Sequence, residues 1–275
     1  MLTTAFRGEG REIEILECSG EEIRDACRRA AQGPSPLVVA AGGDGTVSAV
    51  AGELAGTRKE LAVVPIGTLN HFARDMGIPL DPKEAARTSV RGNVARIDVG
   101  EVNGRVFVNN SSLGFYPSLV SGRDWIRRRQ GRGKWSALIR AGLALWSRCP
   151  TVAVRLSTSE GVITRRTPLV FVGNNRYELT GWSLGSRQQL DGGELFVCVA
   201  PGGSPWRMVG LALRALFSRR RTPRGLEKIS VSELWIEGPA SPGLVSADGE
   251  VHRMDAPLHY RIRPAALSVR VPAPA

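Results

Sequence analysis

A short run of residues suited to binding phosphate, Gly42-Gly43-Asp44-Gly45-Thr46, directly follows the apolar segment Leu37–Ala41. Apolar residues then recur at helical spacing, so the order indicated is strand, glycine turn and helix. Glycines let the backbone approach an anion closely, and the first N–H groups of the helix point toward it. Thr46 can cap that helix or contact a phosphate oxygen. Taken alone, the motif is equally typical of a plain glycine turn in which Asp44 caps the helix.

Asp44 is the unusual member of this turn. A carboxylate placed among phosphates repels them unless a divalent cation lies between the two. The turn therefore predicts a complex of a metal ion with a nucleotide, in which Asp44 acts through magnesium directly or across a water molecule.

A second unit of the same kind follows in the chain. Leu61–Ile66 indicates another buried strand, and Gly67–Arg74 leads from it into a helix that stops near Gly77. The two glycine turns then lie at the ends of neighbouring strands. In an open α/β sheet that is the edge where ligands bind.

Together the two motifs, GGDGT and P-x-G-T-x-N-x-F-A-R, resemble the catalytic domain of the diacylglycerol kinase family, which also contains sphingosine kinases and bacterial soluble lipid kinases. The resemblance covers most of the chain from about Leu37 onward and continues through Ile97–Gly100, Phe107–Asn109, Ser112–Phe115, Val172–Asn174 and Asp248–Glu250. It implies ATP and Mg²⁺ as cofactors and transfer of the γ-phosphate to a hydroxyl of a lipid such as diacylglycerol. It also implies an active site in a cleft between two domains.

The resemblance implies roles for particular residues. Glu250 matches the position that the family uses as proton acceptor, and a carboxylate there would take the proton from a lipid hydroxyl, an effect of ~10²–10⁴ in rate. Without the resemblance, Glu250 is an ordinary exposed hairpin residue, because Asp-Gly is a common turn signal. We expect the nucleotide to contact residues of both glycine turns: Gly42, Gly43, Gly45, Thr46, Gly67, Thr68 and Asn70.

The sequence departs from the family pattern at three places. Family members usually begin with a strand and an Asn-Pro-x-Ser/Ala-Gly loop that also contacts ATP phosphates. This sequence lacks that segment, so we expect either a start further upstream or an incomplete nucleotide site. The second motif commonly has an aspartate where this chain has His71, which can hydrogen-bond or merely begin a helix. Where the family often has two aspartates that bind a structural magnesium, Asp191 remains and Gly192 replaces the second. The metal candidates are therefore Asp44 and Asp191.

Two other functions stay open. An NAD kinase-like enzyme also carries GGDG in an α/β domain, although the G-T-x-N-x-F-A-R motif favours the lipid kinases. A catalytically idle relative that binds nucleotide or lipid is the alternative from a different class. The missing first loop and His71 motivate it.

The order of elements indicates two domains. Residues 1–99 alternate helix and strand, with helices over Ser19–Ala31 and from Asp81-Pro82 onward, which predicts an α/β domain with a parallel sheet like those of NAD kinase and phosphofructokinase. Residues 100–275 begin with a hairpin signal at Asn103-Gly104 and are mostly β, and the resemblance implies an antiparallel β-sandwich whose last strands can return to the first domain. Strand-like runs follow at Val152–Leu156, Leu169–Val172, Leu195–Val199, Ile229–Ile236, Leu258–Ile262 and Leu267–Val271.

The composition fits a soluble enzyme. The 275 residues, 42% of them hydrophobic, can bury a large core, and no apolar run reaches the length of a membrane span. The four cysteines show no C-x-x-C spacing, which makes zinc improbable and reduced thiols expected. The N-terminus lacks the apolar core of a signal peptide, so we expect a cytoplasmic protein.

The net charge of +11 is concentrated in two segments, residues 121–148 and 214–228, each of which contains or adjoins Trp and Leu residues. Such segments suit the surface of an anionic membrane, through Arg127, Arg128, Arg129 and Lys134 in particular. A plainer interpretation is that the charged residues form solvated faces and that the Trp and Leu residues pack in the core. Nucleic acid is not expected as a partner, because no zinc finger, ribonucleoprotein motif or aromatic strand platform is visible. The sequence leaves open whether the protein forms a homodimer.

The membrane hypothesis predicts the behaviour of the triple variant Arg127→Ser, Arg128→Ser and Arg129→Ser. Each Lys or Arg near an anionic surface contributes roughly 1 kcal/mol, so binding to phosphatidylserine-containing vesicles should weaken on the order of 100-fold. Sedimentation with vesicles measures this, and neutral phosphatidylcholine vesicles are the control. Unchanged sedimentation would count against the basic segment.

Overall fold

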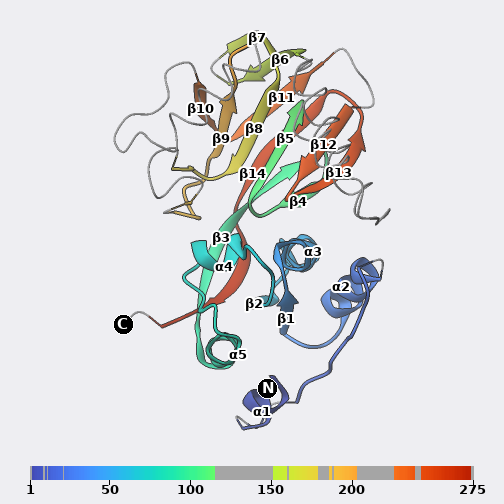
Figure 1. Ribbon diagram of the computed structural model, residues 1–275, viewed down its shortest axis with the longest axis vertical. Helices are drawn as coiled ribbons and strands as arrows, with labels where there is room; N and C mark the ends of the chain where they lie inside the picture. Colours follow the sequence, from blue (N-terminus) through green and yellow to red (C-terminus); the bar gives the residue numbers. More distant parts are fainter. Residues whose placement is uncertain are drawn as a thin grey trace, which may run out of the picture.

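Figure 1 shows the computed structural model as two units stacked along its long axis and joined by two long strands, β3 and β14. The structure describes residues 2–8, 10, 12–20, 22–114, 151–159, 161–178, 186–187, 189–202, 226–238 and 243–273. Within these ranges, no helix combines the length and the apolar character needed to cross a bilayer.

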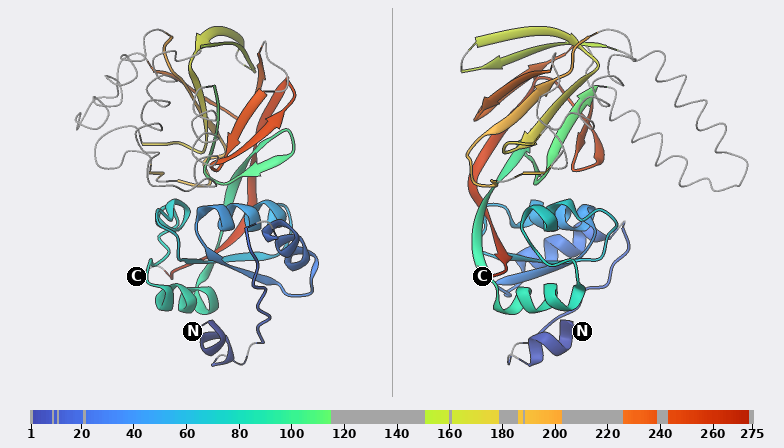
Figure 2. Two further views of the ribbon diagram at one scale, coloured as in Figure 1. Left: turned by 45° about the vertical axis from the view of Figure 1, so that its right-hand side comes forward. Right: turned by 60° about the vertical axis from the view of Figure 1, so that its left-hand side comes forward.

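The N-terminal unit is a small sheet with helices on both faces. β1 pairs in parallel with β2, and β2 pairs in parallel with the end of β14. Figure 2 shows α3 and α4 on the side of this sheet that faces the second unit, and α5 on the opposite side. In chain order its helices and first strands are α1 (Leu2–Arg7), α2 (Ile23–Gln32), β1 (Leu37–Gly42), α3 (Asp44–Leu54), β2 (Glu60–Pro65), α4 (His71–Asp75) and α5 (Pro82–Arg91).

These elements follow from local sequence. Leu61 through Pro65 are all buried, as expected for a strand covered on both faces. α5 begins where Asp81 was expected to start it, and the Asp81 carboxylate accepts the N–H groups of Lys83 and Glu84. α2 begins at Ile23 rather than at Ser19. The Ser19 N–H and hydroxyl instead bind the Glu22 carboxylate and form a separate turn ahead of the helix.

The second unit consists of two facing layers of mostly antiparallel strands. One layer has the strand order β10-β9-β8-β5-β12-β13, and the other contains β14, β11, β6 and β7, with β3 beside β14 and β4 beside β3. A hydrophobic core that includes Phe107, Leu156, Leu195 and Leu234 fills the space between the layers. The strands are β3 (Asn93–Val102), β4 (Arg105–Phe107), β5 (Asn110–Gly114), β6 (Val152–Thr158), β7 (Gly161–Thr167), β8 (Leu169–Asn174), β9 (Leu195–Val199), β10 (Glu227–Val231), β11 (Glu233–Glu237), β12 (Gly243–Ala247), β13 (Glu250–Met254) and β14 (Leu258–Val271).

Two predictions about strands need correction. The run Ile229–Ile236 was expected to be one strand, but the chain changes layers at Ser232, so that β10 and β11 belong to different sheets. Such corners occur where a strand crosses from one packed sheet to another. Conversely, the two runs expected at Leu258–Ile262 and Leu267–Val271 form the single strand β14.

β14 is the strand that unites the molecule. It pairs antiparallel with β3 from Asn93 to Val102, antiparallel with β11, and parallel with β2. The pairing of β14 with both β2 and β3 makes one mixed sheet of eight strands rather than a purely parallel one. The predicted domain boundary at residue 99 falls within β3 and stays a prediction.

A bulge in β14 marks the passage between the units. The register with β3 shifts between Arg263 and Leu267, and Ala265 has a positive φ of 49°. The buried Asp98 carboxylate of β3 accepts the Ala265 N–H at 2.8 Å through one oxygen. Its other oxygen accepts the Gly193 N–H at 2.7 Å and the Asn175 amide at 3.2 Å. Asp98 therefore fixes the bulge and the loop before β9 together.

The variant Asp98→Ala should lower the free energy of unfolding by about 3 kcal/mol, because three N–H donors, one of them on the buried Asn175, lose a charged acceptor. Urea unfolding followed by circular dichroism measures the change. Asp191→Ala, which removes an exposed carboxylate from the adjoining loop, is the matched control and should leave stability within about 0.5 kcal/mol. Equal losses in both variants would contradict a special role for Asp98.

Candidate functional site

The first glycine turn connects β1 to α3 without a side-chain cap. Gly43 occupies the N-cap position in an extended conformation, and its carbonyl accepts the first helical hydrogen bond, from Val47. A Cβ atom on Gly42 would overlap the Thr46 side chain, so Thr46 packs over bare backbone. The leading N–H groups of α3 have no partner within the helix and carry the positive end of its dipole.

The second glycine turn touches the first. A Cβ atom on Gly67 would lie 2.5 Å from the Gly43 Cα atom and 2.8 Å from the Asn70 side-chain oxygen. The Ile66 N–H donates to the Gly42 carbonyl at 3.1 Å, which extends the pairing of β1 and β2 into both turns. The two predicted turns therefore meet as bare backbone at one edge of the sheet, and side chains at these glycines would force them apart.

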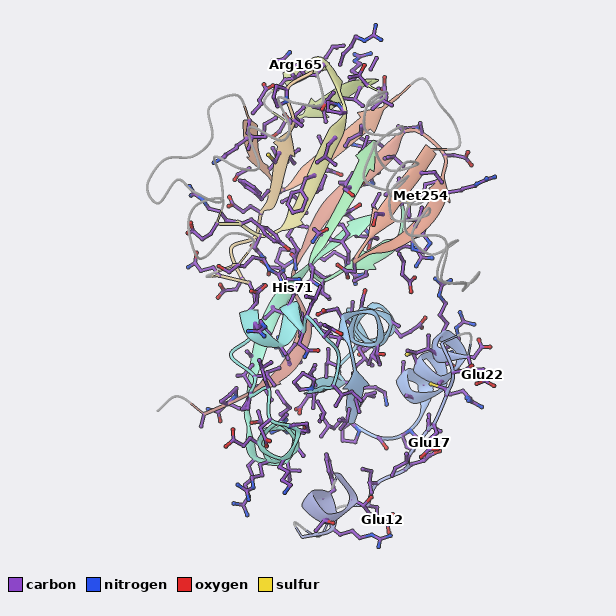
Figure 3. The ribbon with its side chains drawn as sticks, in the orientation of Figure 1. Glu12, Glu17, Glu22, His71, Arg165 and Met254 are labelled. Carbon is purple, nitrogen blue, oxygen red and sulfur yellow. The ribbon has the colours of Figure 1, made fainter. Side chains whose placement is uncertain are left out.

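Asn70 holds the second turn in shape. It has a positive φ of 50°, which asparagine tolerates better than most residues. Its side-chain oxygen accepts the Gly67 N–H at 3.0 Å, and its amide donates to the Gly67 carbonyl at 2.9 Å. Thr68 and Leu69 form the exposed tip of the turn. The exposed His71, labelled in Figure 3, begins α4 on the side of the N-terminal unit that faces the second unit.

Asp44 links the two turns rather than capping its own helix. One of its carboxylate oxygens accepts the Phe72 N–H, in the first turn of α4, at 3.2 Å. The partly buried carboxylate therefore stands between the N-termini of α3 and α4.

Glu250 lies on the hairpin of β12 and β13, whose turn residues Asp248 and Gly249 both have positive φ. Its side chain is 46% exposed, and Arg24 of α2 donates to it at 2.8 Å across the two units. His252 lies 3.6 Å from the same oxygen. Burial, then the charge of Arg105, lowers the pKa of His252. Glu250 is therefore a carboxylate surrounded by basic side chains.

Asp248 fastens this hairpin to the helix of the first glycine turn. Its partly buried carboxylate accepts the Ser48 hydroxyl of α3 at 2.6 Å. It also accepts the N–H groups of Val108 and Asn109 at 2.8 Å and of Asn110 at 3.1 Å. Burial raises the pKa of Asp248, and these four donors oppose that rise. Ser48 comes one helical turn after Asp44, so Asp248 sets the position of the Glu250 hairpin relative to the first glycine turn.

Sequence reasoning missed the contacts that assemble this site. Asp-Gly-Glu was noticed as a motif, but Asp248 was given no role. Nothing in the sequence near Ser48 marks it as a partner of Asp248, and nothing near Arg24 marks it as a partner of Glu250. Ser48 and Asp248 are 200 positions apart, and Arg24 and Glu250 are 226 positions apart. Local periodicity carries no signal at that range.

The second metal candidate, Asp191, is exposed in the loop before β9. A Cβ atom on the neighbouring Gly192 would lie 2.8 Å from the side-chain oxygen of the buried Asn175, so this loop has no room for a second aspartate. Among the described residues, no three His, Cys, Asp or Glu side chains gather as metal ligands. The role of Asp191 stays a prediction.

The predicted membrane contacts Arg127, Arg128, Arg129 and Lys134 lie outside the described residues, as do most of the two basic segments.

Comparison with known proteins agrees with this architecture. The pattern of the diacylglycerol kinase catalytic domain matches residues 2–102. A probable lipid kinase, YegS-like, from Pseudomonas aeruginosa is 32% identical over 98% of this chain and 88% of its own length. A diacylglycerol kinase from Bacillus subtilis is 44% identical over 34% of this chain and 31% of its own length. A crystal structure of a putative diacylglycerol kinase from Bacillus anthracis str. Sterne shares the fold, with a TM-score of 0.73 at 22% identity, and covers 98% of this chain and 91% of that one.

The chain therefore belongs to the YegS-like lipid kinases of the diacylglycerol kinase catalytic domain family.

The raised pKa of Asp248 predicts a pH dependence of stability. The folded state binds this proton more tightly than the unfolded state, so the stability that the group contributes is complete below its ordinary pKa of 3.8 and is lost as pH rises through the raised value. The advantage in unfolding free energy of the wild type over Asp248→Asn should therefore be largest in acid and shrink toward neutral pH. Urea unfolding at a series of pH values measures it, and an advantage that grows with pH would show that the four donors outweigh burial.

Proposed function

We propose that the protein is an ATP-dependent, magnesium-requiring lipid kinase that transfers the γ-phosphate to a hydroxyl of diacylglycerol or a related lipid at a membrane surface. The observation that carries this proposal is the Ser48–Asp248 contact, which ties the helix of the first glycine turn to the hairpin of Glu250. Phosphoryl transfer requires that a phosphate site and a group that accepts the hydroxyl proton be held in fixed relation.

The glycine turns fit the phosphates of ATP. The bare backbone at Gly43 and Gly67 allows an anion to approach more closely than a side chain would, and the N-terminus of α3 favours negative charge there. In this proposal Gly42, Gly43, Gly45 and Thr46 act from the first turn. Asn70 acts by shaping the second turn, since its amide binds Gly67 from both sides, while Gly67 and Thr68 present the turn to the nucleotide.

Magnesium fits the donor set as an ion shared with the nucleotide. Mg²⁺ is typically held by one or two carboxylates together with substrate phosphates and water. A single carboxylate, that of Asp44 at the edge of the sheet where the two glycine turns meet, is therefore a suitable protein ligand. When bound, the ion neutralises phosphate charge. Asp191 is the less favoured candidate because of its exposure in a loop with no room for a second carboxylate.

Glu250 is the proposed proton acceptor. The lipid oxygen forms a bond to the γ-phosphorus while the bond from phosphorus to the bridging oxygen of ADP breaks. The hydroxyl proton passes to the Glu250 carboxylate. The neighbouring positive charges of Arg24 and Arg105 suit a site where phosphate charge must be stabilised.

We further propose a cytoplasmic enzyme that works peripherally at the membrane. The basic segments in the sequence support this location, because a lipid acceptor lies in the bilayer and anionic headgroups attract Lys and Arg.

The variants Glu250→Gln and Asp44→Asn should each lower phosphate transfer at least about 100-fold, because the first removes the proton acceptor and the second the metal ligand. Transfer of labelled γ-phosphate into mixed micelles measures this, with circular dichroism to verify folding. Glu237→Gln, which alters another exposed carboxylate paired with an arginine, is the matched control and should keep full activity. Normal transfer by both site variants would refute the site assignment.

The acceptor is tested with a panel of diacylglycerol, monoacylglycerol and sphingoid base, with NAD in a parallel reaction. A labelled lipid that depends on Glu250 would support the proposal and identify the acceptor class. Label in NAD would assign the protein to the NAD kinase-like alternative. ATP binding without any transfer would assign it to idle relatives.

A further inference from the structure

A buried guanidinium connects the two units behind the glycine turns. The Arg187 side chain is completely buried, and its Nε atom donates to the Asp75 carboxylate at 2.8 Å. Its Nη atoms donate to the Val108 carbonyl at 2.6 Å, the Asn174 carbonyl at 3.2 Å and the Asn109 side-chain oxygen at 2.8 Å. Arginine is rarely buried unless it is paired in this way.

The oxygens that receive these bonds belong to both units. Asp75 ends α4 in the N-terminal unit, whereas Val108 and Asn109 connect β4 to β5 and Asn174 ends β8. Tyr177 also contacts this group: the centroid of its ring lies 5.4 Å from the guanidinium carbon of Arg187, and its hydroxyl donates to the Asn109 carbonyl. Arg187 thereby holds α4 against the second unit.

The segment Val108–Asn110 is clamped from two sides. Its N–H groups donate to the Asp248 carboxylate, while the Val108 carbonyl and the Asn109 side chain accept from Arg187. Through Ser48, Asp248 reaches α3, the helix of the first glycine turn. Through Asp75, Arg187 reaches α4, the helix of the second glycine turn.

The contact between Arg187 and α4 also bears on the position of the Asp44 carboxylate. Asp75 and Phe72 belong to the same helix of five residues, and the Phe72 N–H donates to Asp44 Oδ1 at 3.2 Å. A shift of α4 relative to the second unit therefore moves the donor that holds the Asp44 carboxylate.

We propose that Arg187 is a positioning residue for phosphate transfer: it fixes α4, and through the Phe72 N–H the Asp44 carboxylate, relative to the sheet that carries Glu250. This role rests on the proposed kinase function. The shape of the guanidinium is essential to it, because three nitrogen atoms in one plane reach a carboxylate, a carbonyl and an amide oxygen together. A lysine ammonium keeps the charge but has one nitrogen, which cannot reach all three.

The kinetic test uses Arg187→Lys and Asp75→Asn, which both retain the size and polarity of the buried side chains. Each should lower kcat about 10-fold to 100-fold per folded molecule, with a smaller change in KM for ATP, because a displacement on the order of 1 Å at the reacting groups has an effect of that size. The folded fraction is measured in the same samples by circular dichroism.

The double variant separates positioning from general destabilisation. If Arg187 acts through Asp75, the combined loss in kcat is clearly smaller than the product of the two single losses. Arg165→Lys is the matched control, since Arg165 makes a two-pronged pair with Glu227 at the far end of the second unit, where Figure 3 labels it. It should leave kcat unchanged. Losses that multiply fully, or wild-type kcat in Arg187→Lys, would overturn the proposal.

Hydrogen exchange provides a readout that does not need activity. In Arg187→Lys, amides in peptides covering residues 67–76 should exchange at least about tenfold faster, with unchanged exchange in residues 161–167. Faster exchange throughout the protein, or none in residues 67–76, would overturn the proposal. If the wild type phosphorylated no acceptor, the proposed function would fail, while exchange would still decide whether Arg187 fixes α4.

Discussion

The pairing of β3 with β14 is the constraint on which the rest of the structure depends. These strands run through both units, so the sheet that carries the glycine turns at the ends of β1 and β2 continues into one layer of the second unit, while the Glu250 hairpin of β12 and β13 belongs to the facing layer. The bulge at Arg263–Leu267 allows the sheet to change direction between the units. Asp98 fixes that bulge by accepting the Ala265 N–H. Two units that share a sheet have far less relative freedom than two domains joined by a linker.

Polar contacts of Asp248 and Arg187 add to the shared sheet in holding the two units together. Asp248 is partly buried and Arg187 is completely buried, and each is surrounded by hydrogen-bond partners that reduce the cost of removing its charge from water. Both bind the connection from β4 to β5, one through its N–H groups and the other through its oxygens. Directional bonds of this kind specify one relative placement, whereas apolar packing alone tolerates small shifts. The helices that follow the two glycine turns are thereby both held in position relative to the same segment, the connection from β4 to β5.

The fold was predictable wherever local signals were strong. The two strand-to-glycine units, the cap at Asp81 and the hairpin at Asn103-Gly104 all formed where the sequence placed them, because turn and cap preferences act over a few residues. The change of layers at Ser232 and the fusion of two apolar runs into β14 were not predictable. Both depend on which distant strand is available for pairing, and the alternation of apolar residues is the same in either case.

The sequence by itself determined the local elements of the candidate site: two glycine turns after strands, a carboxylate within the first turn, and an Asp-Gly-Glu turn near the C-terminus. It determined these because glycine, aspartate and asparagine have turn and cap preferences that act over a few residues. The tertiary structure alone decided how the parts are held, with Asp44 bound by the Phe72 N–H, Asp248 bound by Ser48, and Arg187 buried against Asp75. Such partners lie up to 200 positions apart, and only the folded arrangement of strands and helices brings them close enough for hydrogen bonds to form.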